Sequence, residues 1–397
     1  MTAQNPDFRI PTELRGEMRQ WRTRAAFVGA AGAVLTAIGF IAVSPNQFYR
    51  SYLWSYMFIL GLSLGPMAWL MLQYVTGGAW GVVIRRPAEA AMRTLPLVAV
   101  MFLPVVVGMN NLYPWMPVHH PVLTAHKAQW LTPTFFLLRA AVYFAGWLLL
   151  SWFFNRWSAE QDRDGGRAAQ RKMGTLAGPG LLFWGLSVTF MSIDWIMSIH
   201  PEWFSTMFGL LFIAGQGLTG MAFLITVMVL LSTRRPMSEV LTPRHLHDLG
   251  KFLLAMVMVW AYFSFSQFLI IWAGNLPEEI PYYLVRINNG WGLVALLLVA
   301  GHFALPFALL LSRDLKRNFK LLASIAVFIL FMRLVDLYWV VTPEFRQQSF
   351  GISWMDFTVP MGLIGLWLAY FLYQLEKRPL MPINNPHLEE ALQHGRE

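Results

Sequence analysis

The stretch FLLAMVMVWAYFSFSQFLIIWAG runs from Phe252 to Gly274 without a charged residue, and the polar sequence NLPEE follows it. A helix of this length rises about 35 Å, enough to cross the ~30 Å hydrocarbon core of a bilayer. Only helices and closed barrels satisfy the backbone in lipid, and so long a continuous apolar run predicts a helix. This segment therefore predicts a membrane protein.

The composition of the whole chain agrees with that prediction. Of its 397 residues, 56% are hydrophobic and 13% are charged, whereas about one-quarter are charged in a soluble protein. The predicted fold class is an all-α polytopic membrane protein. Apolar blocks between charged loops predict ten membrane helices, at 25–43, 52–77, 95–116, 133–154, 175–199, 205–232, 251–275, 291–312, 319–342 and 355–374.

The distribution of basic residues predicts the orientation in the membrane. The N-terminal segment, every second loop and the C-terminal tail hold 24 of the 30 Lys and Arg residues. This excess predicts cytoplasmic termini and a multi-pass protein of the bacterial inner membrane. No cleavable signal peptide is expected. The net charge of +9 alternates by loop, which does not favour a nucleic-acid partner.

A weak internal duplication relates the second to fifth predicted helices to the sixth to ninth. RRPAEA (Arg85–Ala90) follows the second helix, and RRPMSEV (Arg234–Val240) follows the sixth. Asp194 lies seven residues before Pro-Glu-Trp, and Asp336 lies seven residues before Pro-Glu-Phe. Four crossings separate the units, so they would be parallel repeats. The predicted organisation is a cytoplasmic segment (1–24), a first helix (25–51), two four-helix bundles (52–204 and 205–345), a tenth helix (346–376) and a cytoplasmic tail (377–397).

Five ionisable residues are expected inside the membrane, where such groups are costly and often functional. Arg139 and Asp194 fall at one depth on neighbouring antiparallel helices, so they are expected to pair. Arg333 and Asp336 share a helix face at i, i+3 spacing, and His302 falls near the middle of the eighth helix. Structural ion pairs and proton-handling groups both explain this pattern.

The outer half of the seventh helix carries a polar stripe. Its members at helical spacing are Ser264, Gln267, Asn275 and Glu278, interrupted only by Ile271. Glu278 and its neighbour Glu279 are expected at the water boundary. Such stripes also serve as hydrogen-bonding contacts between membrane helices, so this explanation stays open.

The histidines and cysteines limit the redox groups that the chain could bind. The chain has no cysteine, which excludes thiolate-ligated Fe–S clusters, CxxCH haem attachment and disulfides. Of nine histidines only His302 is predicted to be deep, so neither a bis-histidine haem nor a zinc or di-iron site is expected. The others are expected in loops or tails: His119, His120, His126, His200, His245, His247, His387 and His394.

Two stretches resemble a known family. MSIDWIMSIHPEWFSTMFG (Met191–Gly209) and FSFSQFLIIWAGNLPEEIPYY (Phe263–Tyr283) are similar to signature segments of alternative complex III, a quinol:cytochrome c oxidoreductase. They resemble most the shorter of its two homologous membrane subunits, which are NrfD-like and similar to polysulphide reductase membrane subunits. That family has ten helices and two four-helix bundles. It has Asp where this chain has His200, so no family role is carried to that residue.

The resemblance implies a respiratory-chain complex that oxidises menaquinone or ubiquinone in the membrane. Electrons would pass to Fe–S clusters in an extracytoplasmic subunit and then to haem c in c-type cytochrome subunits. Other implied partners are the longer homologous membrane subunit, membrane lipid and a terminal oxidase. In the family the quinol site belongs to the longer subunit, and the shorter one contributes a related pocket or part of a proton path.

On this basis Asp194 is predicted to accept a quinol proton, with Arg139 as its partner. The predicted proton path consists of His302, Arg333, Asp336, Gln267, Asn275, Glu278 and Glu279. The residues predicted to flank a quinone ring are Trp203, Phe204 and Trp272. Two other functions fit the same pattern: a proton-coupled secondary transporter, and a structural anchor for an extracytoplasmic Fe–S and haem c subunit.

Overall fold

The computed structural model describes residues 8–119, 123–165 and 167–394. Within these ranges there is no strand, and ten helices or helix runs are long and apolar enough to cross a membrane. The predicted all-α polytopic fold is therefore confirmed. The ten are α1 (Thr12–Ala42), α2 (Pro45–Thr76), the run α3–α5 (Arg85–Val107), α8 (Pro133–Asp164), α9 with its last turn (Arg167–Ile199), α10 (Phe208–Leu231), α12 (Pro243–Gly274), the run α14–α15 (Trp291–Leu311), α17 (Phe319–Phe345) and α18 (Met355–Leu375).

Short helices make up most of the connections. They are α6 (Met109–Leu112), α7 (Ala125–Trp130), α11 (Met237–Val240), α13 (Pro281–Ile287), α16 (Arg313–Arg317) and α19 (Leu388–His394). Two membrane runs are themselves divided. The first consists of α3 (Arg85–Met92), α4 (Leu95–Val100) and α5 (Leu103–Val107), and the second of α14 (Trp291–Leu297), a π-helical segment (Leu298–Ala304) and α15 (Leu305–Leu311).

Several helices extend beyond the predicted apolar blocks. α1 begins at Thr12, inside the segment predicted as a cytoplasmic extension, and α2 begins at Pro45, so the predicted boundary at residue 51 falls within α2. Hydropathy detects only the apolar part of a helix that lies in the hydrocarbon core. The helical backbone hydrogen bonds continue through the polar residues beyond that core, so the helix is longer than its apolar part. The third predicted helix starts ten residues early, at Arg85, and Pro96 and Pro104 divide it, because proline cannot donate to the preceding turn.

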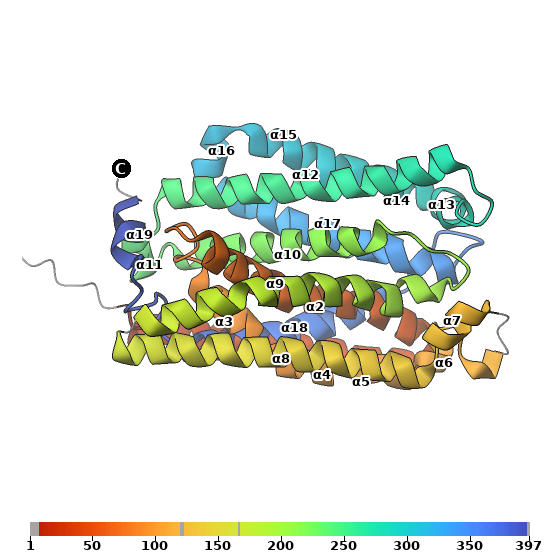
Figure 1. The fold of residues 1–397 in the computed structure, drawn as a ribbon, viewed down its shortest axis with the longest axis horizontal. Helices are drawn as coiled ribbons and strands as arrows, with labels where there is room; N and C mark the ends of the chain where they lie inside the picture. Colours follow the sequence, from red (N-terminus) through yellow and green to blue (C-terminus); the bar gives the residue numbers. More distant parts are fainter. Residues whose placement is uncertain (1–7, 120–122, 166, 395–397) are drawn as a thin grey trace, which may run out of the picture.

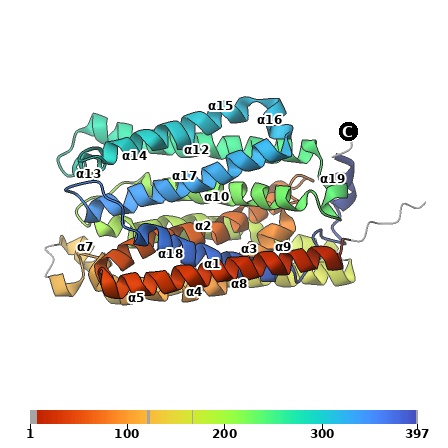
Figure 2. The same ribbon diagram turned by 180° about the vertical axis from the view of Figure 1, so that it is seen from behind.

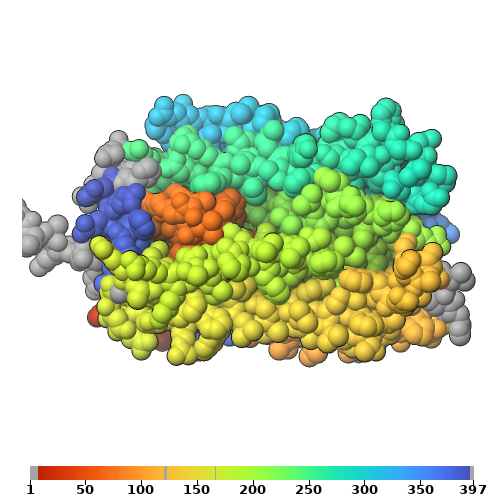
Figure 3. Space-filling model, viewed as in Figure 1, coloured from red at the N-terminus to blue at the C-terminus, as the bar shows by residue number. Residues whose placement is uncertain are grey.

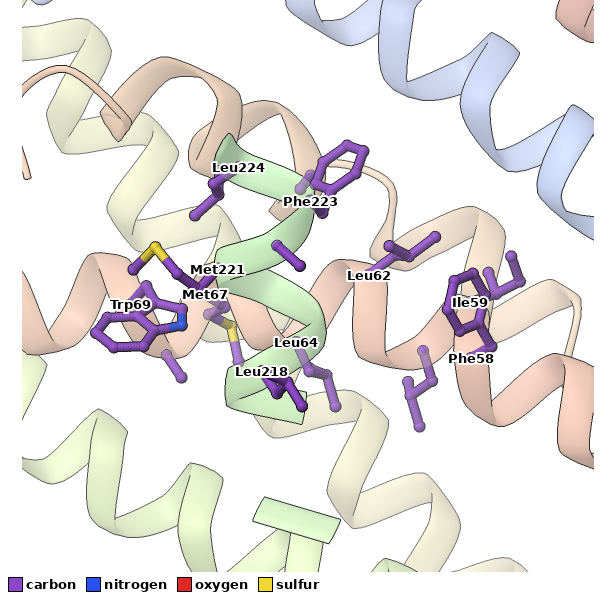
Figure 4. Packing of buried hydrophobic residues seen from close by; sticks show 14 of the residues in the cluster. Phe58, Ile59, Leu62, Leu64, Met67, Trp69, Leu218, Met221, Phe223 and Leu224 are labelled. Atoms are coloured by element: carbon purple, nitrogen blue, oxygen red, sulfur yellow. The ribbon is translucent and has the colours of Figure 1, made fainter. Parts of the chain in front are cut away.

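The centre of the molecule is the crossing of α2 and α10, which are the most buried of the ten. They are also the first helices of the two predicted units. Gly65 and Gly220 allow the two backbones to touch, since a Cβ on Gly220 would lie 2.5 Å from the carbonyl carbon of Gly65. Figure 4 shows Leu64 and Met67 of α2 packed against residues of α10 at this crossing.

The remaining helices group around this pair. α2 packs against α3 and α9, and α10 packs against α12 and α17; α2 also contacts α17, and α10 also contacts α9. α8 lies along one edge of the molecule and α12 with α15 along the other (Figure 1). α18 packs between α2 and α1, and α1 lies on the outside of this pair, as Figure 2 shows from behind. Contacts between the two predicted four-helix units are as extensive as those within them, so the division into two bundles stays a prediction.

Both ends of the described chain lie at the same end of the bundle. The backbone N–H of Leu380 donates to the carbonyl of Phe8 (3.0 Å), and α19 lies at this end (Figure 1). We call it the terminal end, and we call the opposite end, where α6, α7 and α13 lie, the distal end. An assignment of the terminal end to the cytoplasm remains a prediction from the basic residues.

Candidate functional site

Arg139 and Asp194 form the predicted ion pair, and its geometry is bidentate. Arg139 on α8 donates from Nε to Oδ2 of Asp194 and from Nη2 to Oδ1, both at 2.8 Å. Two further residues complete the carboxylate shell: the Tyr143 hydroxyl donates to Oδ2 (2.7 Å) and Trp130 Nε1 donates to Oδ1 (3.0 Å). Asp194 is fully buried. Four donors occupy its oxygens, which is the full capacity of a carboxylate.

The partners of this pair also hold one another. The guanidinium of Arg139 lies 4.1 Å from the centre of the Trp130 ring and donates to the Trp130 carbonyl. Tyr113, beyond α6, donates to the carbonyl of Trp195 (3.1 Å). Burial, and next the nearby charge of Asp194, raise the pKa of Tyr113 well above its usual range. Tyr143 and Trp130 were not among the predicted site residues, although Tyr143 lies one helical turn beyond Arg139.

The second unit contains a buried pair of different construction. Arg333 and Asp336 form an ion pair on one face of α17, as their spacing predicts. Trp260 of α12 donates to Oδ2 of Asp336 at 3.2 Å. Gly215 of α10 leaves room for the arginine, since a Cβ there would collide with the guanidinium. The arginine that pairs with Asp194 comes from a neighbouring helix, whereas Asp336 is paired within its own helix.

His302 lies beside this pair and is fully buried. Its ring meets Trp260 edge-on, with ring centres 4.3 Å apart. Neither ring nitrogen has a hydrogen-bond partner among the described residues. The residue sits in the π-helical segment Leu298–Ala304. Pro306 follows it by four residues and lacks the N–H that would bind the carbonyl of His302 in an α-helix, and π-helical turns often mark functional positions.

Toward the distal end, Gln267 connects to groups outside α12. Its amide oxygen accepts from Ser205 (3.1 Å) and its amide nitrogen donates to the Tyr283 hydroxyl (3.4 Å). Burial raises the pKa of Tyr282 to about 12, while nearby Arg286 acts in the opposite direction. Burial also raises the pKa of Tyr283. Both phenols therefore keep their protons at physiological pH.

A buried carboxylate that the sequence analysis passed over lies at the distal end. Glu344 accepts from Arg286 Nη1 at 2.6 Å and contacts His200 Nδ1 at 3.0 Å. Arg286 also donates to the Val340 carbonyl (2.6 Å) and stacks on Tyr282, 3.5 Å from the ring centre. This cluster joins the end of α9 to α13 and α17. Glu344 is the glutamate of the second Pro-Glu sequence in the predicted duplication, so the sequence contained a signal for this residue.

The glutamates that were predicted to form the exit lie in the loop between α12 and α13. α12 ends at Gly274, and Asn275 caps it in the left-handed conformation (φ 50°). The predicted stripe therefore stops at Ile271, because Glu278 and Glu279 are no longer on the helix. Glu278 is exposed, Glu279 is partly exposed, and neither side chain has a partner among the described residues. The predicted helix also ended at residue 275, so the stripe included a glutamate beyond the helix end.

The three predicted quinone-flanking rings do not face one another. Trp203 is buried and stacks on Tyr282, with ring centres 3.9 Å apart and planes 11° apart. Phe204 and Trp272 are 54% and 69% exposed, and no ring contact joins them to each other or to Trp203 within the described chain. A membrane-facing position explains Phe204 and Trp272 without a quinone.

The histidines give no metal constellation among the described residues, where no group of three His, Asp or Glu side chains is close enough to hold an ion. His245 was expected in a loop, but it lies in the first turn of α12, is buried and contacts the Ala391 carbonyl at 2.9 Å. His247 also belongs to α12. His120 lies outside the described residues, as does the side chain of His394.

The RRPAEA sequence is a buried charge network, not an exposed loop. Arg85 and Arg86 of α3 both bind Glu89 (2.9 and 2.7 Å), and all three are fully buried. Arg378, beyond α18, also reaches Glu89 (3.2 Å), and Arg86 binds Asp162 of α8. Through Arg378, this network ties the C-terminal tail to α3 and α8 at the terminal end.

Comparison with family models and with curated proteins finds no match to the chain. The functional proposal therefore rests on the geometry of the two buried ion pairs and of His302.

Proposed function

We propose that this chain is an integral membrane subunit of a quinol:cytochrome c oxidoreductase and that its second unit contributes a proton path. The observation that carries the proposal is His302, a fully buried side chain whose two ring nitrogens have no hydrogen-bond partner among the described residues. A neutral imidazole has one donor and one acceptor nitrogen, so it can take a proton at one nitrogen and release one at the other.

The groups around His302 would form the middle of that path. Trp260 contacts both His302 and Asp336, and Arg333 holds the carboxylate of Asp336 in place. Intramembrane carboxylates and histidines in a row are the usual elements of proton relays. In this proposal the protons move along α12 and α17 toward the distal end.

At the distal end we propose a buried proton exit in place of the predicted exit at Glu278 and Glu279. Gln267 and Tyr283 form a hydrogen-bonded step, and Glu344, held by Arg286 and His200, supplies the last carboxylate before water. His200 is partly exposed, so it connects this cluster to the surface. Glu278 and Glu279 would act only as surface charges.

The quinone and the redox centres are assigned to partner subunits. The chain has no cysteine and supplies no thiolate to an Fe–S cluster or a haem c. Tyr282 already covers a face of the Trp203 ring, which leaves the predicted flanking residues a poor fit to a quinone. We therefore place quinol oxidation on the longer homologous subunit that the resemblance implies.

The first unit favours a structural contribution to the same complex. Asp194 already accepts from four donors, so an incoming proton would have to displace one of them. A buried, fully satisfied pair of this kind fixes how α7, α8 and α9 pack together. Anchoring of an extracytoplasmic partner at the distal end is the second function that this observation favours.

The proton path is tested by His302→Leu in the purified complex reconstituted into lipid vesicles. This change breaks no hydrogen bond of the described structure, unlike Asp336→Asn, which leaves Arg333 without its partner. We expect fewer protons released per electron while quinol-driven reduction of cytochrome c continues. His126→Leu, an exposed change in α7, is the control. An unchanged ratio of protons to electrons in His302→Leu would show that the path does not use this residue.

A further inference from the structure

A groove on the outside of α8 and α9 has features of a lipid site. It has a volume of about 520 Å³ and lies near the terminal end, where its lining consists of Trp157, Arg171, Lys172, Thr175, Leu176 and Pro179. Figure 3 shows α8 and α9 along the lower part of one face, with no other helix covering them there. The groove belongs to neither of the buried pairs described above.

The groove lies where charged residues give way to apolar ones. On α9 the last charged residue before the apolar run is Lys172, and on α8 the first charged residue after the apolar run is Arg156. Trp157 lines the groove at this boundary. Tryptophan concentrates at the interface between water and hydrocarbon, so this is the depth at which lipid headgroups meet acyl chains.

Positive charge lines one side of the groove. Arg171 is exposed and has no hydrogen-bond or ion-pair partner among the described residues. Lys172 contacts Glu160 at 2.9 Å, in a pair whose side chains are 46% and 32% exposed, which is worth little in water. Between Arg156 and Lys172 the chain has five Lys and Arg against three Asp and Glu, and one of these acids, Asp162, is bound by Arg86.

The other side of the groove suits an acyl chain. Leu176 and Pro179 are apolar lining residues one turn further into the membrane. Pro179 lies inside α9 and has no N–H, so the carbonyl of Thr175 lacks its helical partner. That carbonyl leaves a hydrogen-bond acceptor near the headgroup level.

We infer that this groove binds an anionic phospholipid, with its phosphate at Arg171 and Lys172 and an acyl chain along Leu176 and Pro179. Basic pockets between membrane helices on the cytoplasmic side recognise anionic headgroups, and the basic residues predict that the terminal end is cytoplasmic. The second unit has no equivalent, because α15 ends at Leu311 and α16 has only five residues. This inference is independent of the proposed oxidoreductase function.

Native mass spectrometry of the purified protein with added lipid tests the inference. We expect the wild-type protein to retain one more phosphatidylglycerol than phosphatidylcholine with the same chains. Arg171→Gln/Lys172→Gln should lose that retained lipid, and so should Thr175→Trp, which fills the groove without changing its charge. Arg317→Gln/Lys320→Gln, an exposed Arg and Lys pair at the same end, is the matched control and should retain it.

Three results would overturn the inference. The first is equal retention of the two lipids by the wild-type protein. The second is undiminished phosphatidylglycerol binding by Arg171→Gln/Lys172→Gln. The third is undiminished binding by Thr175→Trp, which would mean that surface charge alone attracts the headgroup and that the groove is not the site.

Discussion

At the scale of single residues, the two buried carboxylates differ in how fully their oxygens are satisfied. Asp194 has donors from three residues on two helices, whereas Asp336 has Arg333 and a longer bond from Trp260. Helix depth and i, i+3 spacing were enough to predict both ion pairs from the sequence. Tyr143 could have been predicted from its position one turn beyond Arg139, whereas Trp130 and Trp260 could not, because their contacts depend on how helices rotate against one another.

The Arg139–Asp194 pair is expected to contribute to stability mainly because each buried charge neutralises the other. Arg139→Met or Asp194→Leu alone leaves a buried charge without its partner, which should cost about 3–5 kcal/mol. The double change removes both charges and should cost clearly less than the sum. Thermal unfolding of the detergent-purified variants measures this. A double variant as unstable as the two single variants combined would argue against a structural pair.

His302→Leu should leave stability unchanged or raise it. The ring nitrogens have no partners among the described residues. An apolar side chain of similar size removes these buried polar atoms without breaking a hydrogen bond. Trp260→Phe, by contrast, removes a donor to Asp336 and should destabilise by about 1–3 kcal/mol. The melting temperatures of both variants check this. A marked loss of stability in His302→Leu would mean that the ring makes bonds that the proposal does not include.

At the scale of helices, apolar periodicity predicted where the ten crossings occur but not how they are interrupted. Pro96 and Pro104 divide the third crossing, and the π-helical segment around His302 precedes Pro306. These prolines were visible in the sequence. Their effect depends on which carbonyls neighbouring helices can satisfy, and that requires the packed structure. α12 ends at Gly274, within one residue of the predicted end, so Glu278 of the predicted stripe lies in the loop beyond the helix.

The crossing of α2 and α10 should be the least tolerant contact between helices. A Cβ at position 220 would lie 2.5 Å from the Gly65 backbone, and backbone cannot move aside without separating the helices. Gly220→Ala is therefore expected to reduce the yield and melting temperature of the folded protein. Gly185→Ala, in α9 with nothing within 4 Å of the new Cβ, should be neutral or stabilising by up to about 1 kcal/mol. Similar effects of both changes would show that the close crossing is not critical.

At the scale of the whole molecule, the predicted duplication stays a prediction, and the two predicted units pack directly against one another. The first helices of both units meet at the centre, and each contacts the last helix of both units. The matching RRP sequences and the matching Asp to Pro-Glu spacings predicted the duplication. They could not indicate that the two units differ chemically, with Asp194 paired between helices and Asp336 paired within one helix.

The predicted orientation can be measured directly because the natural chain has no cysteine. Glu278→Cys places a thiol at the exposed distal end, and Lys320→Cys places one at the terminal end. A membrane-impermeant maleimide should label the first in intact cells from which any outer membrane has been removed. It should label the second only after the membrane is opened. The reverse pattern would place both ends of the chain outside the cytoplasm.

The central claim is that this chain belongs to a quinol-oxidising complex whose redox centres lie in partner subunits. The most direct test is affinity purification of the tagged chain from its native membrane in mild detergent, followed by absorption spectroscopy, iron analysis and an assay of cytochrome c reduction by a quinol. We predict that haem c and non-haem iron co-purify with the chain and that the preparation reduces cytochrome c. Recovery of the intact chain alone, without haem, iron or quinol-dependent activity, would contradict the claim.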